Sequence, residues 1–160
     1  MDILTKSGPK ESTIDDKNRV SIPLRFRDSY PGKLMITSGF ERCVWIMSLA
    51  VYKRLSQSIV DSELLTPEER LELERRFKDM AEETEIDKIG RIAVPAVLKR
   101  YAGLSKDCMV LYSENRLELW NTESFFANLD KNDETFRQGY NKLGSNDFFR
   151  AAGEGQKNQG

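Results

Sequence analysis

The chain has 160 residues, of which 39% are hydrophobic, and this is enough for one compact domain or two small ones with a buried core. It contains no histidine, which excludes Ser-His and Cys-His catalytic pairs and every imidazole metal site. With 25 basic and 26 acidic residues the formal net charge is −1, so any nucleic-acid contact has to come from a local cationic patch.

The sequence shows no targeting or membrane signal. No stretch approaches the roughly 18 consecutive apolar residues of a membrane span, and the first residues lack the basic-then-apolar order of a secretory signal. We therefore expect a cytoplasmic protein. Cys43 and Cys108 are isolated in sequence, which fits neither a metal knuckle nor a disulfide framework, so we expect buried, reduced thiols. No metal or other cofactor is expected.

The first predicted element, residues 13–23, recurs as residues 85–95, and the chain therefore contains an internal repeat. The offset is 72 residues, as from residue 15 to residue 87. Four residues of the first segment are identical in the second: Ile14, Asp15, Arg19 and Pro23 recur as Ile86, Asp87, Arg91 and Pro95.

Each repeat predicts a β-hairpin followed by a short helix. The hairpin loop contains Asn18 in the first repeat and Gly90 in the second, and both residue types tolerate a positive φ. Pro23 and Pro95 follow the hairpins at positions where a helix can begin, because proline lacks only an N–H that the first helical turn leaves unpaired.

Two further strands are predicted in each repeat, at residues 33–37 and 43–47 and at residues 107–112 and 116–120. These strands carry apolar residues on both faces, so both faces need to be covered. A lone hairpin of this size cannot provide that cover. We therefore expect the two repeats to interlock around shared cores, and apolar surface left uncovered to promote oligomerisation.

Between the repeats, residues 66–69 have the sequence Thr-Pro-Glu-Glu, which predicts a capped helix start. The polar stretch from Asp130 onwards predicts a mobile tail. The predicted organisation is a first repeat at 8–52, a helical linker at 53–80, a second repeat at 81–124, and a C-terminal helix with a mobile tail at 125–160.

The strongest candidate site is the pair of hairpin loops with their flanking Asp and Arg residues. Arg19 and Arg91 can each donate two hydrogen bonds to guanine O6 and N7 in the major groove, which a two-stranded ribbon is slim enough to enter. Lys17 and Lys88 are suited to phosphate contacts. Basic residues on the following helix, Arg25 and Arg27, are further candidates for DNA contacts.

A purely structural interpretation competes with this one. An Asp and an Arg four residues apart across a tight turn can form an ion pair, or the carboxylate can accept loop N–H bonds. We assign Asp15 and Asp87 to this loop-shaping role. The spacing alone leaves the role of the arginines open, and their repetition on two hairpins favours function. Trp45 and Trp120, on predicted strands, are expected to pack in the core.

These motifs resemble the MraZ family of bacterial regulators, which carries two Asp-x-x-x-Arg motifs, each followed by a β-branched pair and a short helix. The similarity runs from about residue 11 to residue 129 and includes residues 99–104 and 117–120. Two positions depart from the family pattern. The N-terminal segment is longer, and Asn18 stands where glycine is usual.

The resemblance implies a mainly β fold with flanking helices (α+β), an AbrB-like swapped-hairpin β-barrel made of two tandem repeats. It also implies ring-shaped homo-oligomers, association with the nucleoid, and no enzyme activity. The partner would be double-stranded DNA, at direct repeats upstream of the division and cell-wall gene cluster, including the protein's own promoter. The residues carried over as DNA-facing are Lys17, Arg19, Lys88 and Arg91, with Arg25 and Arg27 as weaker additions.

Three alternatives remain open at this point. An antitoxin of the same fold would also bind DNA, although such antitoxins typically have a single repeat and a tail. A carboxylate-based hydrolase would need two acidic groups converging in a pocket, at least one with a perturbed pKa. A structural ring protein would leave the basic loops as solvated surface, and titration with DNA would separate it from a regulator.

Overall fold

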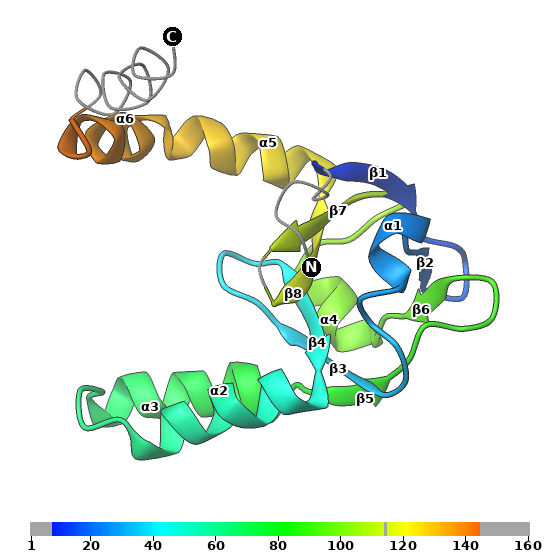
Figure 1. Ribbon diagram of the computed structural model, residues 1–160, viewed down its shortest axis with the longest axis horizontal. Coiled ribbons are helices and arrows are strands. Elements are labelled where there is room, and N and C mark those ends of the chain that lie inside the picture. Colours follow the sequence, from blue (N-terminus) through cyan, green and yellow to red (C-terminus); the bar gives the residue numbers. More distant parts are fainter. Residues whose placement is uncertain (1–7, 114, 145–160) are drawn as a thin grey trace, which may run out of the picture. The chain divides into compact units, whose positions relative to one another are not determined.

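The computed structural model describes residues 8–113 and 115–144, and Figure 1 shows its ribbon. The described residues form eight strands flanked by helices, which confirms the predicted mainly β class. The chain divides into two compact units, the first ending at Thr122 and the second beginning at Glu123.

Six strands of the first unit form one antiparallel sheet in the order β1-β7-β8-β4-β3-β5, and the other two form the separate ribbon β2-β6. The predicted later strands of each repeat are present, as β3 and β4 and as β7 and β8. The bounds are β1 (Lys10–Thr13), β2 (Arg19–Ser21), β3 (Leu34–Ser38), β4 (Val44–Ser48), β5 (Glu82–Thr84), β6 (Arg91–Ala93), β7 (Asp107–Ser113) and β8 (Arg116–Asn121).

The two repeats exchange their first strands. β1 belongs to the first repeat but pairs with β7 of the second, while β5 belongs to the second repeat and pairs with β3 of the first. The second strand of each repeat is also shared, because β2 pairs with β6. The fold is therefore a swapped-hairpin arrangement within one chain.

This exchange agrees with the interlocking, swapped-hairpin repeats that were expected, and it shows how little of each predicted hairpin pairs within its own repeat. β1 and β2 are joined by a tight turn, but between them the described residues pair only through the bridge of Ile14 with Val20. Beyond that bridge each strand pairs with the other repeat. The sequence pattern predicts the turn correctly, but it cannot show which strands pair with β1 and β2.

Both repeats contribute to one core. Val20 and Ile22 of the first repeat and Ile92 of the second have no exposed surface, and they belong to the same cluster of buried side chains. Leu34 and Leu119, whose strands are apolar on both faces, are also buried within the single chain. Apolarity on both faces of these strands is thus explained by the interlocking repeats and does not by itself require oligomerisation.

A short helix follows each strand of the ribbon, as the prolines predicted. The two helices are α1 (Leu24–Arg27) and α4 (Ala96–Tyr101). Pro23 and Pro95 occupy the N-cap positions, with φ of −54° and −56°, so each proline precedes the first helical residue. Phe26 and Leu98 anchor the helices, because each places its side chain in the core.

The segment between the repeats is helical. Its elements are α2 (Leu49–Asp61), α3 (Pro67–Leu73) and the π-helix η2 (Glu74–Lys78). The predicted capping box is present, since the Glu69 amide donates to Thr66 Oγ1 at 3.1 Å and the Thr66 amide donates to Glu69 Oε1 at 2.9 Å. Phe77 is buried and its ring stacks on Tyr52, so the helices pack on one another.

The second unit, as far as it is described, is formed by α5 (Thr122–Lys131), apart from its first residue, and α6 (Asp133–Lys142). α6 lies inside the stretch that composition assigned to a tail, so the prediction placed the start of the tail too early. Phe136 and Tyr140 are four residues apart and stack with centroids 6.3 Å apart, a pairing that supports a helix. Residues 145–160 of the expected tail lie outside the described residues.

Both cysteines are buried and unpaired. Burial raises the pKa of both thiols, that of Cys108 to about 11. Trp120 is buried as predicted, whereas Trp45 is half-buried, with the Arg116 guanidinium 4.2 Å from its ring centroid. Over the ranges that the structure describes, no helix combines the length and the apolar character needed to cross a membrane.

The shared core predicts that a substitution in the ribbon destabilises both repeats together. Ile92→Ala should lower the free energy of unfolding by about 2–5 kcal/mol, because it removes a fully buried side chain at the junction of the repeats. Denaturant unfolding should show one cooperative transition. Val97→Ala on α4, where the side chain is 52% exposed, is the control and should change the stability by at most about 0.5 kcal/mol. A cost below about 1 kcal/mol for Ile92→Ala would contradict the shared core.

Candidate nucleic-acid interface

The β2–β6 ribbon has one buried and one exposed face. Val20 lies opposite Ile92, and both side chains point into the core. Because neighbouring residues of a strand point to opposite faces, the residues on either side of this pair share the outer face. That face is formed by Arg19, Ser21, Arg91 and Ala93.

Each arginine of the outer face stands opposite a small residue. Arg19 pairs with Ala93 and Arg91 pairs with Ser21, and both small residues are exposed. The arginine side chains are 31% and 27% exposed. The outer face therefore carries two cations, Arg19 and Arg91. Because the residues opposite them are small, a binding partner can approach both guanidinium groups.

The first turn is closed by Asp15. Its Oδ1 accepts hydrogen bonds from the backbone amides of Lys17 and Arg19, both at 2.9 Å. The Asn18 amide donates to the Asp15 carbonyl at 3.0 Å, and Asn18 has a φ of 60°. Asparagine adopts this left-handed conformation more readily than most residues, so the turn forms without the glycine that is usual at this position.

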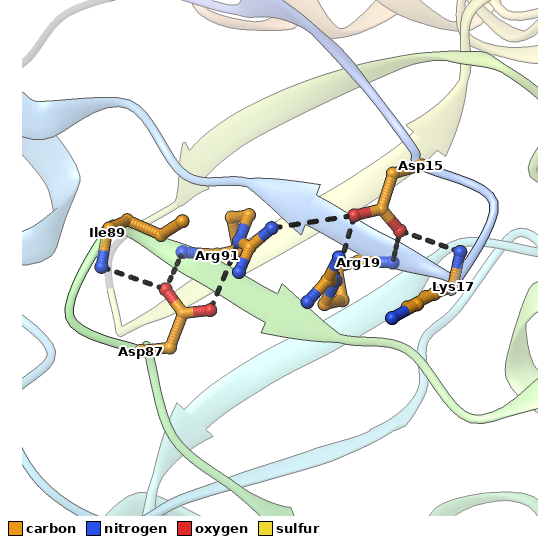
Figure 2. A network of polar contacts seen from close by, with 6 residues as sticks. All are labelled: Asp15, Lys17, Arg19, Asp87, Ile89 and Arg91. Atoms are coloured by element: carbon orange, nitrogen blue, oxygen red, sulfur yellow. Dashed lines mark hydrogen bonds and ion pairs between the residues drawn. The ribbon is translucent and has the colours of Figure 1, made fainter.

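The second turn has the same hydrogen bonds (Figure 2). Asp87 Oδ1 accepts from the amides of Ile89 at 3.1 Å and Arg91 at 2.8 Å. The Gly90 amide donates to the Asp87 carbonyl at 2.9 Å, and Gly90 has a φ of 86°. The two turns are thus equivalent local structures, one at the start of each ribbon strand.

Each aspartate also contacts the arginine of its own turn. Arg19 Nε donates to Asp15 Oδ2 at 2.8 Å, and Arg91 Nε donates to Asp87 Oδ2 at 3.2 Å. Arg91 Nη1 also lies 3.8 Å from Asp15 Oδ2, which links the two turns (Figure 2). Among the described residues, the terminal nitrogens of Arg19 have no further partner. An aspartate that holds Nε leaves the two-nitrogen end of the guanidinium available for a bidentate contact.

The hydrogen bonds stabilise the charged form of both aspartates. The backbone amide of Arg19 has the largest effect and lowers the pKa of Asp15, with further lowering from the Arg19 side chain and the Lys17 amide. The Arg91 amide lowers the pKa of Asp87 in the same way, assisted by the Arg91 side chain and the Ile89 amide. Desolvation opposes these effects in both turns.

Backbone hydrogen bonds hold each turn on the other repeat. The Val94 amide donates to the Asn18 carbonyl, and the Ile22 amide donates to the Gly90 carbonyl, both at 2.8 Å. These two bonds extend the ribbon at its two ends. Because each turn is fixed by a strand of the opposite repeat, neither turn depends on its own hairpin alone for its position.

Two equivalent cations, Arg27 on α1 and Lys99 on α4, add side-chain contacts to this arrangement. Lys99 Nζ donates to Asn18 Oδ1 at 2.9 Å, and Arg27 Nε donates to the Ile22 carbonyl at 2.7 Å. The Arg27 guanidinium also fills the space beside Gly90, where a Cβ atom would come within 1.9 Å of Arg27 Cζ. Glycine is therefore required at position 90 for two reasons: the backbone φ is positive, and the Arg27 guanidinium leaves no room for a Cβ atom.

The structure thus brings most of the predicted site residues together. Lys17 and Lys88 are exposed on the turns, and Arg25 is exposed on α1. Arg27 is half-buried and supports the ribbon, which gives it a structural role in addition to any contact with DNA. Sequence reasoning missed that Lys99 contacts the turn of the other repeat, although the 72-residue offset between Arg27 and Lys99 marks them as equivalent.

The geometry disfavours the carboxylate-hydrolase alternative. Asp15 and Asp87 use their oxygens to accept hydrogen bonds from turn amides and arginines. Their pKa values are lowered, whereas a carboxyl that acts as a general acid needs a raised pKa. In the described part of the chain, no three His, Cys, Asp or Glu side chains are placed to hold a metal ion.

Comparison with known proteins identifies relatives that match most of the chain. The family model described as "MraZ protein, putative antitoxin-like" matches residues 7–75 and 79–144. The "Transcriptional regulator MraZ" of Frankia alni is 35% identical over 131 residues, which cover 82% of this chain and 91% of the relative. The protein of the same title from Treponema denticola is 33% identical over 143 residues, covering 89% of this chain and 99% of the relative.

The lowered pKa values predict how the turns respond to acid. Each carboxylate stabilises the folded turn above the ordinary Asp pKa of 3.8, and this contribution is lost as the pH falls through the lowered pKa. NMR titration of the Arg19 and Arg91 amide signals should show midpoints below 3.8. Asp15→Asn should abolish the Arg19 titration and leave that of Arg91. A midpoint at or above 3.8 would show that the hydrogen bonds do not favour the carboxylate.

Proposed function

The chain belongs to the MraZ family, and from that premise we propose that it is a sequence-specific DNA-binding regulator of transcription that inserts its β2–β6 ribbon into the major groove. The observation that carries this proposal is the outer face of the ribbon. Arg19 and Arg91 stand there beside small neighbours, oriented by aspartates that leave guanidinium nitrogens exposed. A two-stranded ribbon is narrow enough for that groove.

In this mechanism the two arginines recognise bases. A guanidinium presents parallel N–H groups that match guanine O6 and N7, and a bidentate pair discriminates against other bases. Asp15 and Asp87 position the arginines and have no direct contact with DNA. Because Arg91 Nη1 is shared with Asp15 at 3.8 Å, Arg19 has the freer guanidinium of the two.

Surrounding cations supply affinity without sequence preference. Lys17 and Lys88 on the turns and Arg25 on α1 are exposed, and in this proposal they neutralise DNA phosphates. The net charge of the chain is −1, so this local patch and not the whole molecule would attract DNA.

We further propose that the target is promoter DNA with direct repeats, upstream of the division and cell-wall gene cluster and including the protein's own promoter. Support comes from the family resemblance and from relatives titled "Transcriptional regulator MraZ". Association of several chains into a ring would let neighbouring copies bind successive repeats, and linked binding raises the overall affinity above that of one site.

The antitoxin alternative shares DNA binding with this proposal, and the family description itself includes the term antitoxin-like. The interlocked repeats argue against it, since both ribbon strands come from one chain and no second copy is needed to complete the ribbon. The structural-ring alternative gives no reason for two arginines on a slim exposed face.

The proposal is tested by selecting genomic fragments that the purified protein retains at physiological salt and sequencing them. Base recognition should enrich particular sites, because phosphate contacts alone do not distinguish sequences. Retention of fragments without any enriched sequence, or no retention at all, would contradict the proposed function.

Replacing the arginines should weaken binding without unfolding the protein. Arg19→Ala or Arg91→Ala should cost roughly 1–3 kcal/mol of specific binding free energy for each bidentate arginine–guanine pair that the substitution removes, with thermal stability nearly unchanged. The double substitution should scarcely bind. The measurements are operator titrations and thermal melts on the same preparations.

Arg75→Ala is a matched control for these substitutions. Arg75 is 60% exposed on η2 and also pairs with a carboxylate, Glu72 at 3.3 Å. This control should leave binding unchanged. If Arg19→Ala and Arg91→Ala instead lowered the melting temperature while the folded fraction bound normally, the arginines would be structural partners of the aspartates only.

Phosphate contacts predict a change in salt dependence. Lys88→Ala should weaken binding to all sequences equally, and the slope of log affinity against log salt should become shallower by about 0.9 for each phosphate that is no longer neutralised. Lys53→Ala on α2, also an exposed lysine, is the control and should leave the slope unchanged. A selective reduction in affinity for the enriched sites with an unchanged slope would assign Lys88 to base recognition.

A further inference from the structure

The two turns differ at two exposed positions, and at the first of them Asp16 of the first turn is matched by Lys88 of the second. With the 72-residue offset, Ile89 in the second turn is equivalent to Lys17 in the first. The backbone amide of each residue donates to the turn aspartate, at 3.1 Å from Ile89 and at 2.9 Å from Lys17. The local backbone is thus the same in both turns, and at this position a cation in the first turn is replaced by an apolar side chain in the second.

Ile89 is held in place yet open to solvent. Its side chain is 64% exposed, although its backbone is fixed by Asp87 and the turn is anchored to the other repeat through Gly90. A β-branched side chain has few χ1 rotamers, so its γ carbons have few positions available. Binding of a partner at Ile89 would therefore cost little additional conformational entropy.

Apart from Asp87, whose carboxylate accepts the Ile89 amide, the charged groups nearest Ile89 in sequence are cationic. Lys88 precedes it, Arg91 follows two residues later, and the Arg27 guanidinium lies beside Gly90. Such surroundings disfavour an apolar protein surface or the interior of a membrane as partner, since both would desolvate these charges. An apolar side chain among cations is complementary to a surface on which an apolar group lies between anions. The major groove offers that combination, because the thymine C5-methyl group lies between the two phosphate backbones.

We propose that Ile89 contacts the C5-methyl group of a thymine and is a specificity-determining residue of this chain. The inference rests on the proposed function, since it requires the ribbon to occupy the major groove. Arg91 on the adjoining strand would contact a nearby guanine, so the second turn and its strand would recognise an apolar group and a pair of acceptors together.

The two ends of the ribbon would then recognise different bases. β2 and β6 are antiparallel, so the turns that precede them lie at opposite ends of the ribbon, as Figure 2 shows for Asp15 and Asp87. One end presents Lys17 beside Asp16, and the other presents Lys88 beside the methyl groups of Ile89. The bound sequence would therefore be asymmetric, with thymine required at the Ile89 end only.

The experiment measures binding to duplexes that carry a sequence enriched in the genomic selection, with each thymine replaced in turn by deoxyuridine. This replacement removes one methyl group and keeps base pairing. At one position the affinity of the wild-type protein should fall about fourfold, the equivalent of about 0.8 kcal/mol for one buried methyl group. Ile89→Ala should bind the thymine duplex more weakly and should not distinguish thymine from deoxyuridine at that position.

Leu64→Ala provides the matched control, because Leu64 is an apolar side chain that is 93% exposed between α2 and α3. It should preserve the wild-type preference for thymine. A second variant, Ile89→Lys, gives the second turn the side chain that the first turn has at this position, in addition to Lys88. It should abolish the thymine preference and produce a steeper salt dependence on every sequence.

Each outcome has a distinct meaning. No enriched sequence for the wild-type protein would overturn the proposed function together with this inference. Enriched sequences and tight binding with no sensitivity to deoxyuridine would overturn the inference alone. The same would follow if Ile89→Ala kept the full thymine preference, because the methyl group would then be contacted by another residue.

Discussion

The structure depends on the pairing of each repeat with strands of the other. β1 completes the sheet next to β7, β5 completes it next to β3, and β2 finds its partner in β6. Without these pairings, Val20 and Ile92 would be exposed and the two turns would lack their backbone anchors at Val94 and Ile22. Stability and the geometry of the candidate site therefore have the same origin.

The aspartates and arginines of the turns serve two purposes that sequence analysis treated as alternatives. Asp15 closes its turn through backbone amides and also holds Arg19 by Nε. An ion pair of this kind, exposed to water, contributes little to stability. It does restrict the directions in which the guanidinium points, which matters for a group that has to meet two acceptors of a base at once.

Much of this was predictable from the sequence, because the signals are local. The paired strands, the capped helix at Thr66, and the turns with Asn18 and Gly90 each depend on residues a few positions apart. The strand exchange was not predictable in detail, since a β-strand pattern does not name its partner. The contact of Lys99 with Asn18 joins residues 81 positions apart and follows from that exchange. Phe136 and Tyr140 show that overall polarity can hide a helix-supporting pair.

The pairing of Lys10 with Val110 joins the first described strand to one of the last strands of the same unit. A chain emerging from the ribosome cannot form this pairing until the strands of the second repeat have been synthesised. Until then β1 and β2 have no partners, and the apolar side chains of the first repeat remain open to association with other chains. Pairing over such separations also slows folding, because the entropy cost of closing the loop precedes the contact. A chain truncated within the second repeat should thus be a substrate for chaperones and proteases, even though its entire first repeat has been made.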